Sequence, residues 1–108
     1  MNVQFKHWKC KAVGAVYNGN GRAIILYEIM EEDGEVDFGS PVATATVNID
    51  ADIPKDNIFI KNYSENSGME EALIEAGIIE PGSNANVKAG FVTVYAFKLT
   101  EEAIKKLW

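Results

Sequence analysis

Residues 58–76 read IFIKNYSENSGMEEALIEA, and the hydrophobic pattern changes its period within this stretch. The apolar run at 58–60 is typical of a short buried strand. From Met69 onward, apolar residues recur at helical spacing while glutamates occupy the other face. The stretch therefore predicts a strand near 57–62 followed by an amphipathic helix near 68–76.

A polar string separates this predicted strand from the helix. Ser67, followed three residues later by Glu70, predicts a capping box at the start of the helix. A cap and an Asx-turn leave Tyr63 unexplained, and a strand-to-helix junction aims backbone N–H groups at one point. The alternative, that the junction is only a cap, stays open. We predict a protein-binding site at this junction, formed by Asn62, Tyr63, Ser64, Glu65 and Asn66.

The sequence before this stretch predicts a β-meander with strands near 12–17, 23–31 and 42–49. Asn18-Gly19-Asn20-Gly21 is a strong hairpin signal, because Asn and Gly tolerate positive φ angles. The strand at 23–31 is apolar on both faces, which predicts a central position in the sheet.

The sequence after it predicts one further strand and one further helix. Gly77 is expected to end the first helix in the left-handed conformation. Residues 85–87 are expected to be loop or early strand, and the last strand is expected at 90–98. Thr100 is expected to cap a helix near 101–107.

Together these elements predict an α+β fold, with residues 1–108 forming a single domain. We expect a four- to five-stranded, mainly antiparallel sheet with one helix packed on a face and a short C-terminal helix. The predicted core is Val13, Ala15, Ile24, Leu26, Ala45, Val47, Ile58, Ile60, Leu73, Phe91, Val94, Ala96 and Leu107.

The charge is distributed unevenly along the 108 residues, whose formal net charge is −6. Residues 26–80 carry fourteen acids against two lysines, and five of the acids gather around a predicted turn. Gathering like charges is destabilising unless a partner neutralises them. We therefore predict a second protein-binding patch at this acidic tip, formed by Glu31, Glu32, Asp33, Glu35 and Asp37. A merely solvated acidic surface is the alternative.

Catalytic and metal-binding signatures are weak. His7 is the single histidine and Cys10 the single cysteine, so they exclude an internal disulfide and a Cys/His metal site within one chain. The sequence disfavours a His7–Cys10 dyad and calcium binding along Asp50, Asp52 and Asp56. We expect no enzyme, no cofactor, no membrane segment and a cytoplasmic location.

A short N-terminal strip mixes basic and aromatic residues, as surfaces that bind single-stranded nucleic acid do. Its members are Lys6, Trp8, Lys9, Lys11 and Arg22. The acidic net charge argues against direct nucleic-acid binding. The strip supports an alternative function, in which an accessory protein binds single-stranded DNA or a transfer protein.

Several blocks of the chain resemble a family of small uncharacterised proteins. These proteins are encoded on plasmids, conjugative elements and prophages of gut bacteria, chiefly Firmicutes. The resemblance spans about residues 15–95, and its most specific block is N-Y-S-E-N-x-G-M at 62–69. The other blocks are NGNGR at 18–22, PVATATVN at 41–48, EAGII at 75–79 and GFV at 90–92.

This resemblance implies an accessory protein of mobile DNA in a bacterial cytoplasm. Small acidic proteins of such elements often bind host defence machinery, as anti-CRISPR and anti-restriction proteins do. Such an inhibitor needs no catalytic residues, because an acidic face can occupy the basic nucleic-acid channel of a nuclease. The first function hypothesis is therefore a non-enzymatic, protein-binding inhibitor of a defence nuclease.

Overall fold

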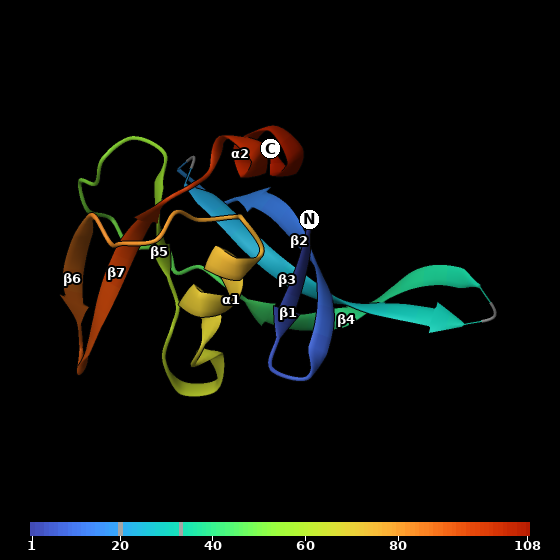
Figure 1. The fold of residues 1–108 in the computed structure, drawn as a ribbon. Helices are drawn as coiled ribbons and strands as arrows, with labels where there is room; N and C mark the ends of the chain where they lie inside the picture. Colours follow the sequence, from blue (N-terminus) through green and yellow to red (C-terminus); the bar gives the residue numbers. More distant parts are fainter. Residues whose placement is uncertain (20, 33) are drawn as a thin grey trace.

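Two antiparallel sheets and two short helices make up the fold of the chain (Figure 1). The computed structural model describes residues 1–19, 21–32 and 34–108. The elements are β1 (Asn2–Phe5), β2 (Trp8–Val16), β3 (Arg22–Glu32), β4 (Glu35–Thr44), β5 (Asn57–Ile60), the 3₁₀ turn η1 (Ser64–Asn66), α1 (Met69–Glu75), β6 (Ala85–Ala89), β7 (Val92–Lys98) and α2 (Glu101–Leu107).

The first sheet is a meander in the order β1-β2-β3-β4. The predicted hairpin after β2 is confirmed: Gly19 has a φ of 95°, and the N–H of Tyr17 donates to the carbonyl of Gly21 at 2.6 Å. Asn20 of that motif lies outside the described residues. The interior position of β3 is also confirmed, because β2 and β4 pair with its two edges. The strand predicted at 12–17 is instead the longer β2, which β1 precedes.

The prediction of a strand at 42–49 was wrong, because β4 ends at Thr44 and begins already at Glu35. Beyond Thr44 the chain crosses from one sheet to the other. The N–H of Ala45 donates to the carbonyl of Ile24 in β3 at 2.8 Å, while its own carbonyl accepts from the N–H of Lys61 at 2.9 Å. Thr46 then forms an isolated bridge with Ile60 in β5. Residues 45–46 therefore join the two sheets, which replace the single sheet that we predicted.

The second sheet has the order β5-β7-β6. Strands near the predicted 57–62 and 90–98 are present as β5 and β7, and the segment left open as loop or early strand is β6. Phe91 was wrongly placed in the core. It lies in the β6–β7 turn beside Gly90, whose φ is 63°, and its side chain is fully exposed.

The helices begin and end largely where their local signals predicted. Gly77 has a φ of 75°, as expected after the end of α1, and Thr100 caps α2 by accepting the N–H of Ala103 at 3.1 Å. The capping box of Ser67 was wrong. The residue before α1 is instead Gly68, which is in the left-handed conformation and has no side chain that could cap the helix.

The main hydrophobic cluster holds residues of both sheets and both helices and unites them into a single domain, and a smaller cluster around Phe59, Val94 and Ala96 lies on the second sheet. α1 packs against β1, and α2 packs against β2, where a Cβ on Gly14 would collide with the carbonyl of Leu107. Most of the predicted core is buried, namely Ile24, Leu26, Ala45, Ile58, Ile60, Leu73, Val94 and Ala96. Ala15, Val47 and Leu107 are half-buried. Val13 was wrongly placed in the core. Cys10 and Ala12 of β2 face the core, so the alternation of the strand turns the side chain of Val13 outward.

Candidate functional site

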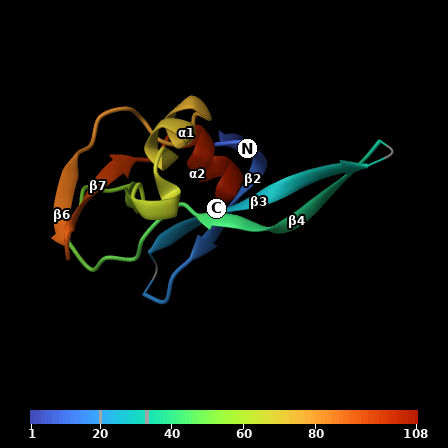
Figure 2. The same cartoon turned by 90° about the horizontal axis from the view of Figure 1, so that it is seen from below.

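The β3–β4 hairpin projects beyond the rest of the molecule, and its residues 29–32 and 34–38 are called the arm here (Figures 1 and 2). Its register pairs Ile29 with Phe38 and Glu31 with Val36. The Cα radius of gyration is 13.8 Å, above the value of about 13 Å expected for a compact chain of this length. The arm therefore extends the molecule instead of adding to its core.

Both acidic and apolar side chains of the arm are open to solvent. Val36 is 60% exposed, Met30 50% and Phe38 48%, and none of the three belongs to either hydrophobic cluster. The acids Glu31, Glu35 and Asp37 are exposed as well. Of the other two residues of the predicted acidic tip, Asp33 and the side chain of Glu32 lie outside the described residues. The described part of the tip therefore lies on an exposed hairpin, as predicted, and it carries apolar side chains that the sequence analysis missed.

The signal that could have found them is the alternation of Glu35-Val36-Asp37-Phe38, which is typical of a strand with one apolar face. The five acids around Gly34 led us to predict a charged turn for this segment instead of a strand.

At two positions, the edge strand β4 offers no free N–H to an additional strand. The carboxylate of Asp37 accepts the N–H of Phe38 at 2.8 Å, and Pro41 carries no N–H. Register shifts between Leu26 and Ile29 further interrupt the ladder. These features are typical of edge strands that resist β-augmentation. These features disfavour strand addition at this edge, so that a partner of the arm would meet mainly its side chains.

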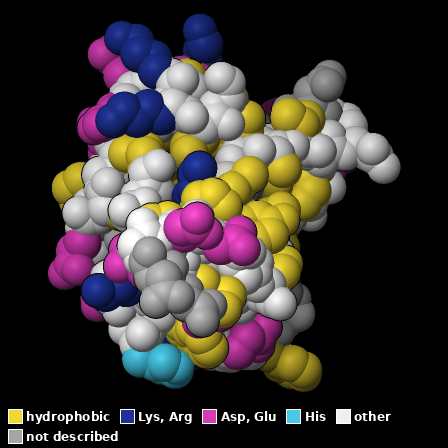
Figure 3. All heavy atoms as spheres, turned by 90° about the vertical axis from the view of Figure 1, so that its right-hand side faces the viewer, with side chains coloured by type: hydrophobic (Ala, Val, Ile, Leu, Met, Phe, Trp, Pro, Cys, Tyr) yellow, Lys and Arg dark blue, Asp and Glu magenta, His cyan; other side chains and the backbone are white. Residues whose placement is uncertain are grey.

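An open groove of about 860 Å³ lies between the arm and the β1–α1 side of the domain. Ile29, Val36 and Phe38 line it from the arm, and Ala72 and Ala76 line it from α1 and its end. Its charged side chains are Lys9, Lys11, Glu31 and Glu75. Lys11 Nζ lies 4.6 Å from the centre of the Phe38 ring, a cation–π contact at the base of the arm. Figure 3 looks toward the arm and shows hydrophobic side chains gathered beside acidic ones.

The predicted junction site has a different structure, because two of its side chains stabilise the fold. Asn66 is 2% exposed, and its Nδ2 donates to the carbonyl of Thr44 at 2.7 Å. Asn62 Oδ1 accepts the N–H of Glu70 at 2.8 Å and so satisfies a free donor in the first turn of α1. The amide groups of Asn62 and Asn66 are thus already bonded within the chain, which opposes their predicted binding role.

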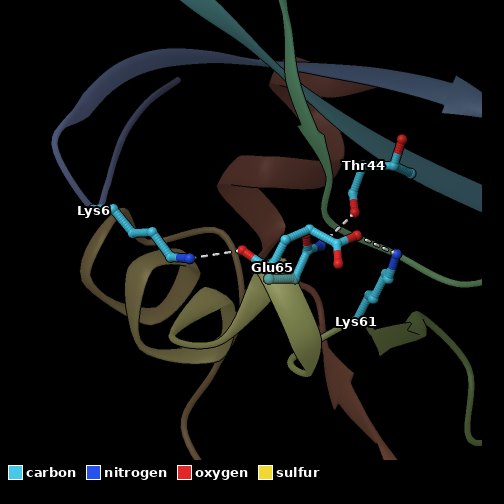
Figure 4. A network of polar contacts seen from close by, with 5 residues as sticks. Lys6, Thr44, Lys61 and Glu65 are labelled. Atoms are coloured by element: carbon cyan, nitrogen blue, oxygen red, sulfur yellow. Dashed lines mark hydrogen bonds and ion pairs between the residues drawn. The ribbon is translucent and has the colours of Figure 1, made fainter.

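The remaining junction residues are partly engaged as well (Figure 4). Glu65 is bound twice: its carboxylate lies 2.9 Å from Lys61 Nζ, and its carbonyl accepts from Lys6 Nζ at 2.8 Å. The bond with Lys61 lowers the pKa of Glu65, and the same bond raises the pKa of Lys61. Tyr63 is half-buried against the smaller hydrophobic cluster. Ser64 is exposed, with a φ of 56°.

The two predicted patches do not form one site. In both cartoon views the arm points away from the body of the domain, which carries the junction (Figures 1 and 2).

Comparisons with known protein families, curated proteins and solved structures identify no relative of the chain. The geometry of the arm, the groove and the junction therefore carries the functional argument.

The sites that the sequence analysis disfavoured have these positions. Cys10 is fully buried, and burial, followed by the nearby Glu28 carboxylate, raises the pKa of its thiol. This opposes a nucleophilic role, since the thiolate is the reactive form.

Among residues 1–19, 21–32 and 34–108, no group of three or more His, Cys, Asp or Glu side chains could hold a metal ion. In the same part of the chain, no helix is long and apolar enough to cross a membrane.

The basic N-terminal strip is divided in the structure. Arg22 pairs with Val16 at one end of β2 and forms an ion pair with Asp56 at 2.9 Å. Lys6 lies in the β1–β2 turn at the other end and donates to Glu65. Lys9 and Lys11 line the groove. The strip therefore does not form one continuous basic track.

Proposed function

We propose that the chain is a non-enzymatic, protein-binding inhibitor of a host defence nuclease, carried by a mobile element and acting in a bacterial cytoplasm. The observation that carries the proposal is the arm, which holds exposed acids and exposed apolar side chains away from the domain core. The resemblance to proteins of mobile elements supports the biological setting.

The arm has the composition of a docking surface. Aromatic residues and methionine are enriched in the centres of protein interfaces, and Phe38 and Met30 are both half-exposed. Nearby carboxylates would steer the arm toward a basic partner and raise the association rate. A nuclease presents such a basic surface wherever it binds the phosphate backbone. An arm seated there would exclude nucleic acid without any chemical step.

Contacts within the chain, such as the bond of Asp37 to the Phe38 N–H and the Lys11–Phe38 contact, explain only part of the composition of the arm. Its apolar side chains remain exposed, and its acids Glu31, Glu35 and Asp37 form no ion pair within the described residues. Large exposed apolar side chains grouped with like charges are characteristic of surfaces that meet a partner.

The test is a cleavage assay with purified defence nucleases, CRISPR effectors first, titrated with the wild-type chain. We expect the wild type to bind one of these nucleases and block cleavage. The double variant Glu31→Lys, Glu35→Lys should inhibit much less. Asp50→Lys, Asp52→Lys is the matched control, because it makes the same charge change in an exposed loop and should inhibit like the wild type.

Two results would oppose the proposal. Equal inhibition by the arm variant and the loop variant would remove the arm from the mechanism. Tight, salt-dependent binding of plain single-stranded DNA, lost when Lys6, Lys9 and Lys11 are neutralised, would favour the accessory function instead.

A further inference from the structure

The groove and the arm are complementary in charge and in polarity. The register of β2 with β3 pairs Cys10 with Glu28, which places Lys9 and Lys11 beside the base of the arm. Glu31 lies farther out along the arm, where it pairs with Val36 and lines the same groove, whereas Glu35 alternates onto the opposite face of the hairpin and does not line it. One face thus carries Lys9 and Lys11 at the base of the arm and Glu31 farther out, beside the apolar side chains of Val36 and Phe38.

We propose that a second copy of this chain occupies the groove, so that the protein forms a two-fold symmetric dimer through reciprocal exchange of arms. A two-fold axis near Val36 and Phe38 brings the apolar side chains of both copies together. The same axis lays Glu31 of each copy against Lys9 and Lys11 of the other. An isologous contact of this kind closes on itself and needs one self-complementary patch.

The contact is made by side chains and not by pairing of β4 with its symmetry mate. The Asp37 carboxylate already occupies the N–H of Phe38, and Pro41 offers no donor. Association therefore rests on apolar burial at the axis and on charge pairs at its two sides. Because these pairs lie near the surface, association should weaken as salt rises.

Glu75 of α1 also lines the groove and faces the same space as the lysines. Its charge would repel the carboxylates of an incoming arm. Glu75→Gln should therefore lower the dissociation constant of the dimer. If the groove had only a structural role, the substitution would not strengthen the association of the two copies.

The inference rests on the arm as a docking surface, as the proposed function does, but it names a different occupant. A nuclease that binds the arm would compete with the second copy. The purified chain alone tests the dimer, whereas the nuclease assay tests inhibition, so that either idea can fail without the other.

Sedimentation velocity of the purified full chain over a range of concentrations measures the association directly. We expect a concentration-dependent dimer whose dissociation constant rises at least about tenfold in Val36→Ser, Phe38→Ser. Val16→Ser is the matched control, because Val16 is 60% exposed on β2 but does not line the groove.

A charge exchange gives the sharpest outcome. The double variant Lys9→Glu, Lys11→Glu and the single variant Glu31→Lys should each be monomeric alone, because each places like charges on both partners of a pair. Mixed in equal amounts, the two variants should form a heterodimer. Circular dichroism and thermal melts verify that both are folded.

Three outcomes would overturn the proposal. The first is a wild-type chain that stays monomeric at every concentration. The second is a dimer that Val36→Ser, Phe38→Ser leaves intact, since the copies would then meet through another face. The third is a mixture of the two folded charge variants that remains monomeric.

Discussion

The arm and the junction are both polar stretches with an aromatic residue inside them, yet the structure uses them in opposite ways. At the junction, the amides of Asn62 and Asn66 are bonded to backbone groups, and Glu65 is bonded to two lysines. On the arm, apolar and acidic side chains stay open to solvent. Polar residues crowded in a sequence therefore do not mark a binding site until their partners within the chain are known.

The largest effect on stability is expected just after the junction. Leu73 of α1 is fully buried, so Leu73→Ala should lower the free energy of unfolding by about 2–5 kcal/mol through lost burial and a residual cavity. Urea denaturation measures the change. A loss well under about 1 kcal/mol would mean that the site collapses around the smaller side chain and that α1 contributes little to the core.

A somewhat smaller effect is expected for the buried amide of the junction. Asn66→Ala removes the donor to the carbonyl of Thr44 and leaves that carbonyl without its partner, which should lower the free energy of unfolding by about 1–3 kcal/mol. The same urea titration gives the value. A neutral substitution would show that the junction is not held by this bond and would return Asn66 to the candidates for binding.

The Lys61–Glu65 pair should give a weaker effect that depends on pH. Because the folded chain lowers the pKa of Glu65, the pair stabilises the fold above the ordinary carboxyl pKa, and this contribution disappears as the pH falls through the lowered pKa. Glu65→Gln should therefore be slightly less stable than the wild type at neutral pH and equally stable in acid. Thermal melts across that range measure the difference. A constant difference at all pH values would contradict the assignment.

The smallest effect on stability is expected on the arm. Val36→Ser changes a side chain that is 60% exposed and belongs to neither hydrophobic cluster, so the free energy of unfolding should change by less than about 0.5 kcal/mol. Urea denaturation beside Asn66→Ala gives the comparison under one set of conditions. A loss above about 1 kcal/mol would show that the arm packs against the domain and is not a displayed surface.

Local signals predicted the parts of this fold that local chemistry determines. The turn at Gly19, the end of α1 at Gly77 and the cap at Thr100 each depend on a few neighbouring residues. The central position of β3 followed from a strand that is apolar on both faces. These features needed no knowledge of distant partners.

The parts that were missed depend on partners far apart in the sequence. Ala45 leaves one sheet for the other because its two backbone groups bond to Ile24 and Lys61. α1 is capped by Asn62, eight residues before the N–H that it accepts, instead of by Ser67. The same holds for the site: the exposure of the acidic hairpin followed from its turn and charges, whereas the bonds that occupy Asn66 and Glu65 involve Thr44 and Lys6.

The most direct test of the account is the affinity of a purified target nuclease for three forms of the chain, measured at equilibrium in one buffer. The forms are the wild type, the arm variant Glu31→Lys, Glu35→Lys and the junction variant Glu65→Gln. We predict that the arm variant loses at least about tenfold in affinity with its free energy of unfolding unchanged, while Glu65→Gln binds like the wild type. A junction variant that loses affinity, beside an arm variant that binds normally, would contradict the assignment of the arm as the docking surface.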